Sequence, residues 1–237
     1  MTNTIPDIKQ FCFNPLGANC YLIWNGSPET VIIDPGFSNP EEKNRLYSFI
    51  EANGLKPVAV VLTHGHFDHV YGAYRLCDDF GIPAYMQPED HPIMTETLGY
   101  AQELGFKDEP LHVVTKDIAD GDRIELIGLE WEVIGTPGHT PGGVCWHIPS
   151  VHIIFTGDTI FRDTIGRTDF SYGDYDKLIV AIMEKVMGLD GSTDILPGHG
   201  GPTSISHERT HNPFLVPFNE KEEINWDADG ITINGLE

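Results

Sequence analysis

The run Thr63-His64-Gly65-His66-Phe67-Asp68-His69 holds three histidines and one aspartate within six residues. Imidazole nitrogens and carboxylate oxygens are good ligands for Zn²⁺ and related divalent metals. In an extended stretch, the i, i+2 spacing puts His64 and His66 on the same side of the backbone. A turn toward a following helix can then bring Asp68 and His69 to face them. The run therefore predicts a metal site where a strand passes into a helix.

Three further ligand candidates stand beside glycines, each just after a short apolar stretch. They are His139, Asp158 and His199. Glycine lets the backbone come close to an ion at such a turn. One Gly-His turn is a weak signal, but with the first run the candidates amount to five histidines and two aspartates. This number suffices for two four- or five-coordinate metals that share one bridging ligand.

The elements that must position these residues are short strands and a few helices. The continuous apolar run Pro57–Leu62, directly before the first ligands, predicts a strand buried on both faces. We expect further strands at Gln10–Phe13, Asn19–Trp24, Thr30–Asp34, Pro83–Met86, Gly121–Leu126, Trp131–Ile134, Val144–Ile148, His152–Thr156 and Thr193–Leu196, and helices at Pro40–Asn53, Val70–Phe80, Pro92–Leu104 and Asp174–Met187. No linker divides the chain, so this alternation predicts one mixed α/β domain over residues 1–237. The acidic tail, residues 219–237, is poorly periodic, and we expect it to be loosely held.

Composition excludes several classes of partner. The 237 residues carry 14 Lys and Arg against 36 Asp and Glu, a formal net charge of −22. Such a charge repels nucleic-acid backbones and anionic membrane surfaces. No apolar run is long enough to span a membrane, and the first residues do not resemble a signal peptide. The four cysteines, Cys12, Cys20, Cys77 and Cys145, form no CxxC pair, which favours a reduced, cytoplasmic protein.

The His-x-His-x-Asp-His run, followed in order by a single His, Asp and His, resembles the metallo-β-lactamase-fold hydrolases. That family implies a four-layer αββα sandwich with a dinuclear metal site along one edge. Residues 161–170, together with His207-Glu208-Arg209 and Asn212-Pro213-Phe214, are most similar to the glyoxalase II-like branch. The likeness extends from about Lys9 to Phe218. Only 38 residues follow His199, so we do not expect the C-terminal helical domain that helps to hold glutathione in that branch.

The resemblance implies roles for individual residues. It implies two divalent metal ions, with zinc as the first choice and iron or manganese as alternatives. The implied ligands are His64, His66 and His139 at site 1, Asp68, His69 and His199 at site 2, and Asp158 as the bridge between the two. Asp34 is expected to orient ligands or loops without binding metal, and a role that is limited to forming the turn at Pro35-Gly36 is the alternative. Arg162, Arg167 and Phe161 are candidate substrate contacts, although salt bridges to Asp163 or Asp169 are an alternative role for the two arginines.

These ligands predict a reaction. Two cations lower the pKa of a bridging water, so that hydroxide, positioned by Asp68 and Asp158, is available near neutral pH to attack a carbonyl. A thiolate with a pKa of about 8.5 can leave unprotonated, whereas an amide nitrogen cannot. We therefore expect the hydrolysis of a small thioester similar to S-hydroxyacyl-glutathione, with a small acyl compound as the partner.

Other functions stay open. A persulfide dioxygenase with one iron shares the stretch Gly166–Phe170, and metal counting together with oxygen consumption would distinguish it. A structural metal-binding module without turnover is another possibility, but structural zinc sites are usually closed and rich in cysteine. Zinc β-lactamases commonly have Cys where Asp158 stands, and flavodiiron proteins prefer Glu at the position of His66 and need a flavin domain.

Overall fold

The structure is a computed structural model that describes residues 5–96, 101, 103–106, 113–219, 223–227 and 230–234. Within these residues the chain builds two six-stranded sheets. The first sheet has the strand order β1 (Asp7–Phe13), β2 (Ala18–Trp24), β3 (Glu29–Ile33), β4 (Lys56–Val61), β5 (Ala84–Met86) and β6 (Thr115–Asp117). The pairs β3–β4, β4–β5 and β5–β6 are parallel, whereas β1–β2 and β2–β3 are antiparallel.

The second sheet has the strand order β14 (Thr203–Ser204), β13 (Asp194–Pro197), β10 (Ile153–Gly157), β9 (Val144–Ile148), β8 (Leu129–Gly135) and β7 (Arg123–Leu126). Its only parallel pair among the described strands is β10–β13. Two short hairpins lie outside both sheets: β11 (Ile160–Phe161) with β12 (Thr164–Ile165), and β15 (Glu223–Asp227) with β16 (Gly230–Asn234).

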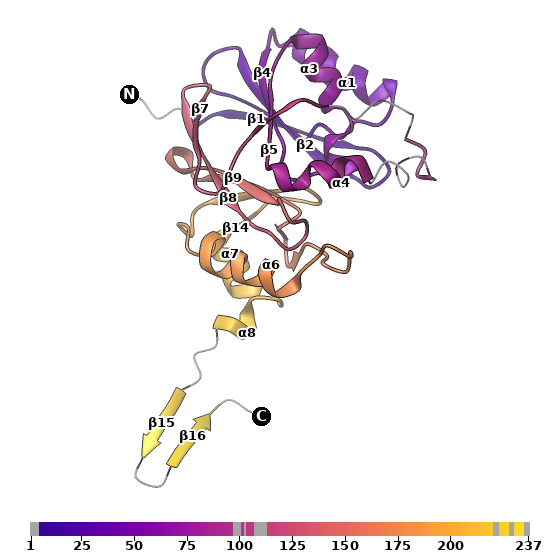
Figure 1. Ribbon diagram of the computed structural model, residues 1–237. Helices are drawn as coiled ribbons and strands as arrows, with labels where there is room; N and C mark the ends of the chain where they lie inside the picture. Colours follow the sequence, from indigo (N-terminus) through magenta and orange to yellow (C-terminus); the bar gives the residue numbers. More distant parts are fainter. Residues whose placement is uncertain are drawn as a thin grey trace.

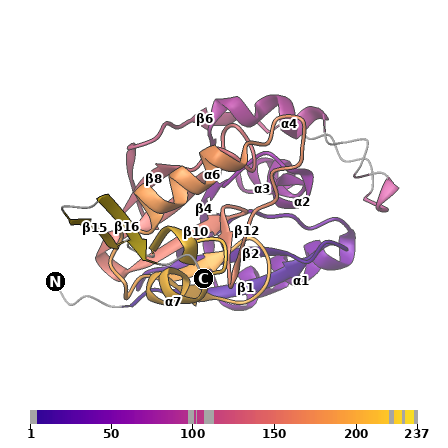
Figure 2. The same cartoon turned by 90° about the horizontal axis from the view of Figure 1, so that it is seen from below.

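Helices cover the outer faces of the two sheets. In Figure 1, α1 (Pro40–Ala52) and α3 (Ala73–Phe80) lie beyond the first sheet, and α6 (Tyr175–Ala181) and α7 (Ile205–His211) lie beyond the second. Figure 2 looks onto the α6 and α7 side. Shorter helical segments are α2 (Phe67–Val70), η1 (Pro88–Asp90), α4 (His91–Glu96), η2 (Pro149–Val151), η3 (Ile182–Val186) and α8 (Val216–Asn219). No described helix is long and apolar enough to cross a membrane.

Alternation along the strands creates three apolar layers. In β2, Leu22 packs toward α1 and α3, whereas Tyr21 and Ile23 pack between the sheets. In β10, Phe155 joins the layer between the sheets and Ile154 packs toward α6. Both sheets are therefore buried on both faces, which confirms the expected four-layer αββα sandwich. Each fully buried aliphatic or aromatic side chain contributes about 1.5–3 kcal/mol to this stacking.

Local signals explain where the first helix begins. The side chain of Asn39 accepts a hydrogen bond from the Glu42 amide at 3.0 Å, and Pro40 occupies the first turn. Glu42 in turn accepts from the Ser38 amide at 2.7 Å and from the Asn14 amide at 2.8 Å. The Asn39 cap confirms the expected start of the helix, and Glu42 ties it to the loop after β1.

The helix expected at Val70–Phe80 is interrupted. The Gly72 amide donates to the Pro35 carbonyl at 2.8 Å, and the Asp68 carbonyl, which would be its helical partner, accepts from the Asn14 side chain at 2.9 Å. The chain therefore forms two helices, α2 and α3. Long-range hydrogen bonds replace one helical bond, and they fix the direction in which α2 carries Asp68 and His69.

Other expectations differ in detail. The helix expected at Asp174–Met187 is α-helical only in α6 and continues as the π-helical turn η3. Strand β6 carries no clear alternation and was not expected. The helix expected at Pro92–Leu104 is observed as α4, and residues 97–100 and 102 of it lie outside the described residues. The described part of the 219–237 tail contains the paired strands β15 and β16, drawn below the sandwich in Figure 1; the loosely held tail stays a prediction.

Candidate metal centre

The predicted ligands meet because they follow the carboxyl ends of strands at one edge of the sandwich. His64 and His66 follow β4, His139 follows β8, Asp158 follows β10 and His199 follows β13. The two sheets are joined at this edge, where Ala18 and His199 form an isolated antiparallel bridge. Segments more than a hundred residues apart are thereby brought together.

The site 1 trio, His64, His66 and His139, converges on one point. The Nδ1 atom of His66 lies 3.1 Å from Nε2 of His64 and 2.9 Å from Nε2 of His139. All three side chains are buried, with 2% to 7% of their surface exposed. Three imidazole nitrogens at this separation form a ready set of ligands for a divalent metal.

The opposite ring nitrogens of this trio have protein partners. Nδ1 of His64 lies 3.0 Å from the Thr63 hydroxyl, Nδ1 of His139 lies 2.7 Å from the Arg167 carbonyl, and Nε2 of His66 lies 2.8 Å from the Tyr172 hydroxyl. If these nitrogens carry the protons, the three converging nitrogens present lone pairs. Lone pairs that face one another at 3 Å need a cation between them, so the donor set fits a metal ion.

The site 2 trio, Asp68, His69 and His199, lies beside the first. Nε2 of His69 lies 3.2 Å from Nε2 of His199 and 3.6 Å from a carboxylate oxygen of Asp68, and that oxygen lies 3.4 Å from Nε2 of His199. His69 is completely buried, whereas His199 is partly exposed to the cavity described below. Two nitrogens and one carboxylate oxygen are again a suitable divalent metal set.

Asp158 lies between the two trios. Its Oδ1 atom lies 3.4 Å from Nε2 of His69, and its Oδ2 atom lies 3.5 Å from Nε2 of His139 and 3.6 Å from Nε2 of His199. Oδ1 is buried and has no hydrogen-bond partner. A buried carboxylate oxygen without a partner costs about 1–3 kcal/mol or more, and a metal ion would remove that cost.

Electrostatics separate the two trios. Burial, reinforced by the neighbouring histidines, holds the pKa of His64 well below its usual value and lowers that of His66 to about 3. Burial also acts to lower the pKa of His69, but Asp68, Asp158 and Asp34 outweigh it and raise the pKa to about 10. His64 and His66 are thus neutral, as a metal requires, whereas a metal at site 2 must displace a proton.

Asn19 holds the loop that carries His199 and was not expected from the sequence. Its side chain donates to the carbonyls of Pro197 and Gly200, both at 2.9 Å, and its amide donates to the Gly198 carbonyl at 2.7 Å. The Tyr21 hydroxyl donates to the same Pro197 carbonyl at 2.7 Å. Strand β2 therefore fixes a ligand loop of the other sheet, and no local signal in β2 indicates this.

Asp90 is a second residue that the sequence analysis missed. Its carboxylate accepts hydrogen bonds from the Gly65 and Gly142 amides, which lie in the two loops of site 1. The signal was present, because Asp90 follows a short predicted strand as the other site residues do.

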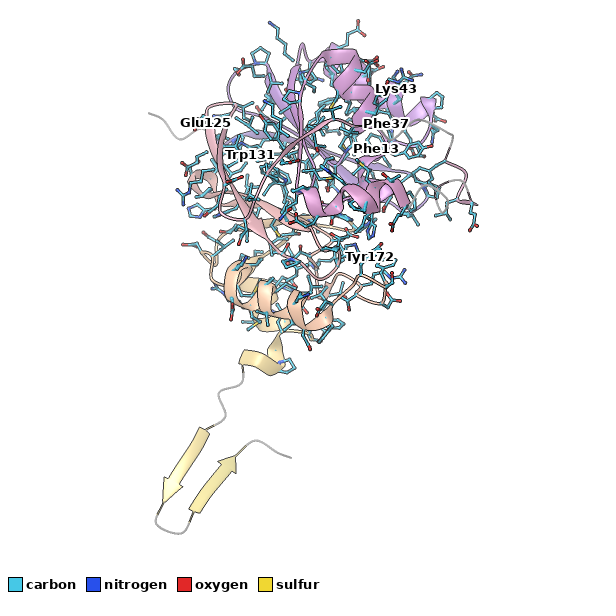
Figure 3. The ribbon with its side chains drawn as sticks, viewed as in Figure 1. Phe13, Phe37, Lys43, Glu125, Trp131 and Tyr172 are labelled. Carbon is cyan, nitrogen blue, oxygen red and sulfur yellow. The ribbon has the colours of Figure 1, made fainter. Side chains whose placement is uncertain are left out.

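A cavity of about 830 Å³ opens onto both trios. Phe170 and Tyr172 form one wall, with stacked rings whose centroids lie 5.3 Å apart, and Leu16 and Leu104 contribute half-exposed apolar side chains. Figure 3 labels Tyr172 in the loop that precedes α6, and its hydroxyl lies 2.8 Å from Nε2 of His66, which follows β4 of the first sheet. The cavity can therefore hold a small molecule with an apolar part against the metal centre.

The predicted substrate contacts occupy different places. Arg167 lines the cavity, but its guanidinium donates twice to Asp169, at 2.6 and 2.8 Å, and lies 4.5 Å from the centre of the Phe170 ring. Arg162 is 60% exposed and lies 3.9 Å from Asp163. Phe161 has its ring centroid 6.0 Å from that of His199. Among the described residues, neither Arg162 nor Phe161 lines the cavity.

The motif around Glu208 has a structural role. The completely buried carboxylate of Glu208 accepts from the Thr203 hydroxyl, the Asp163 amide at 3.0 Å and the Asn212 side chain at 2.8 Å. The Asn212 side chain also donates to the Thr164 carbonyl at 3.1 Å. These contacts fix α7 against the β11–β12 hairpin that follows Asp158.

Comparison with known proteins agrees with this geometry. The sequence pattern of the metallo-beta-lactamase superfamily matches residues 13–208. The chain belongs to the metallo-beta-lactamase superfamily. An uncharacterised protein of Mycobacterium leprae is 41% identical over 217 residues, which are 88% of this chain and 98% of that protein. The hydroxyacylglutathione hydrolase GloC of Haemophilus influenzae is 37% identical over 199 residues, 83% of this chain and 92% of that enzyme.

Solved structures of the superfamily are similar over nearly the same span. The B3 metallo-beta-lactamase BLEG-1 is 31% identical with a TM-score of 0.78, over 88% of this chain and 99% of that one. The protein TTHA1623, solved in a di-iron-bound form, is 32% identical with a TM-score of 0.78, over 87% of this chain and all of the other.

Proposed function

We propose that this protein is a hydrolase that uses two divalent metal ions to cleave a small thioester, with zinc as the preferred metal. The observation that carries the proposal is the position of Asp158, whose two carboxylate oxygens lie 3.4 Å from Nε2 of His69 in one trio and 3.5 Å from Nε2 of His139 in the other. A single carboxylate that reaches both trios suits two adjacent metal ions.

The acidic and aromatic residues of the cavity have different roles in this reaction. When bound, divalent metal ions lower the pKa of water and polarise a carbonyl oxygen. Asp68 and Asp158, both at the floor of the cavity, accept hydrogen bonds from water and orient it toward the substrate carbonyl. The stacked rings of Phe170 and Tyr172 pack against the apolar part of the substrate and exclude other water.

The protonation state of Asp68 bears on which leaving group the site can release. Burial would raise the pKa of Asp68, but His69 and His199 outweigh it and hold the pKa at about 2. Asp68 is therefore ionised at neutral pH and cannot protonate a leaving group. A thiolate departs without that proton because its conjugate acid has a pKa of about 8.5, whereas an amine must be protonated. A thioester therefore needs no proton from Asp68, whereas an amide or a β-lactam would need another donor.

The relative from Haemophilus influenzae makes an S-hydroxyacyl-glutathione the first substrate to test. We also propose a cytoplasmic location, which the four unpaired cysteines support.

The test combines metal analysis with a substrate panel. Purified protein is expected to hold two divalent ions per chain and to hydrolyse S-lactoylglutathione or a related thioester faster than the matched oxygen ester or amide. Asp158→Asn should lose metal and turnover together, whereas Asp117→Asn, at an exposed aspartate in β6, should lose neither. Full turnover and full metal content in Asp158→Asn would show that the site is wrongly assigned.

A persulfide dioxygenase is a second candidate function. The di-iron-bound relative shows that the fold accepts iron, although it holds two ions where this function needs one. One iron per chain, together with oxygen consumption on addition of a glutathione persulfide, would replace the hydrolase by this oxidative function. Bound metal without turnover of either substrate class would leave a structural metal-binding module.

A further inference from the structure

Asp90 joins the two loops that carry site 1. Its Oδ2 atom accepts a hydrogen bond from the Gly65 amide at 2.8 Å, and its Oδ1 atom accepts from the Gly142 amide at 2.6 Å. Gly65 lies between the ligands His64 and His66, and Gly142 lies three residues after His139. Asp90 itself is completely buried and belongs to neither trio. One carboxylate thus links the two loops that carry the three ligands of site 1.

The close approach of Asp90 requires glycine in both loops. A Cβ atom on Gly65 would lie 2.5 Å from the Asp90 carbonyl oxygen, and a Cβ atom on Gly142 would lie 2.8 Å from Oδ1 of Asp90. Both distances are shorter than real Cβ contacts, so a side chain at either position would push a loop away from Asp90. The carboxylate and the two glycines therefore act as one unit, the Asp90 clamp.

The clamp complements the backbone link between the same loops. The Val144 amide donates to the Thr63 carbonyl at 2.8 Å and holds the loops at their strand ends. The clamp links the same loops at Gly65 and Gly142, next to the ligands. Both amide hydrogen bonds of Asp90 are buried, where leaving a polar group without its partner costs about 1–3 kcal/mol, so the clamp can fix the separation of the loops before a metal binds.

We propose that Asp90 is a positioning residue that sets the distance between the His64–His66 loop and the His139 loop, and thereby the metal affinity of site 1. The inference rests on the proposed metal sites. Site 2 depends on other contacts, because His69 is held by Asp34 and the His199 loop by Asn19. Asp90 should therefore affect the two sites unequally, which a general loss of folding stability would not do.

The test compares Asp90→Asn with Glu89→Gln, which makes the same change of charge at the exposed neighbouring residue. Asparagine has nearly the same size as aspartate, but its NH₂ group replaces one acceptor oxygen. That donor would then face the backbone N–H of Gly65 or Gly142. In chelator competition with Zn²⁺, the site 1 affinity of Asp90→Asn should fall about 10–100-fold, with site 2 changed less than about threefold. His139→Ala and His199→Ala identify which affinity belongs to which site. Gly142→Ala should reproduce the loss, and it serves as the test if Asp90→Asn does not fold.

A metal-free readout tests the clamp directly. In the apoprotein, the Gly65 and Gly142 amides should exchange hydrogen at least tenfold faster in Asp90→Asn than in wild type or Glu89→Gln. Unchanged exchange at both amides, or equal losses of affinity at both sites, would overturn the role of Asp90. If the wild type binds no divalent metal, the proposed function fails, and the exchange rates alone decide whether the clamp exists.

Discussion

Asp34 orients the ring of His69, because its Oδ2 atom accepts a hydrogen bond from Nδ1 of His69 at 3.1 Å. The opposite nitrogen of that ring, Nε2, is thereby directed at site 2. The same oxygen accepts from the Thr63 hydroxyl at 2.6 Å, and Oδ1 accepts from the Thr63 amide at 2.8 Å. Because Thr63 precedes His64 and its hydroxyl contacts that ring, one carboxylate orients a histidine of each trio. An orienting role for Asp34, expected from the family resemblance, stays a prediction that metal binding can test.

Replacement of Asp34 by asparagine should weaken metal binding. Asp34 adopts a φ of 47°, a conformation that asparagine tolerates well, so the backbone is not strained. The amide cannot accept all three hydrogen bonds, and we expect the metal affinity to fall about 10–100-fold, as measured by chelator competition. Asp117→Asn is the control at an exposed site, and equal affinities in the two variants would contradict the orienting role.

Tyr172 makes two separate contacts, one with each part of its side chain. Its hydroxyl lies 2.8 Å from Nε2 of His66, and its ring stacks on Phe170. Tyr172→Phe should therefore lower the site 1 metal affinity several-fold and leave KM for a thioester nearly unchanged. Tyr172→Ala should also raise KM by about tenfold because it removes part of the cavity wall. The same KM in both variants would show that the ring does not contact substrate.

Removal of metal should destabilise the fold. An ion present at about a thousand times its Kd stabilises the native state by about 4 kcal/mol. For a domain of this size, 1 kcal/mol changes Tm by about 2–4 °C, so a chelator should lower Tm by roughly 10 °C. Differential scanning calorimetry with and without EDTA measures the change. Asp158→Asn is expected to respond much less, and an identical response would argue against metal at these sites.

His147 should make stability depend on pH, away from the metal centre. Burial lowers its pKa below 6.5, Glu132 at 3.3 Å opposes this in part, and His152 adds to the lowering. Because the unfolded chain then binds the proton more tightly than the folded one, His147 contributes stability above about pH 6.5 that is lost as the pH falls through the folded pKa. Between pH 7.5 and 5.5, Tm should fall less in His147→Gln than in wild type. An equal or larger fall in the variant would contradict this sign.

Local patterns in the chain, together with the family resemblance, identified the candidate metal ligands. Five of the seven ligand candidates follow an apolar strand, Asp68 and His69 lie in the short helix α2 directly after them, and the structure brings all seven to one edge. The period-two and buried strand patterns also predicted most strands within a few residues, and Asn39-Pro40 predicted the start of α1. These features depend on neighbouring residues, which is why the sequence alone reveals them.

Contacts between distant segments were decided only when the two sheets packed together. Asp90 and Gly142 are 52 residues apart, and Asn19 and Pro197 are 178 residues apart. No local propensity records such pairs, because they depend on the stacking of the sheets and on the break between α2 and α3 that long-range hydrogen bonds cause. The side chains that chemistry needs are thus visible in the sequence, whereas the residues that hold them at 3 Å from one another follow from tertiary packing.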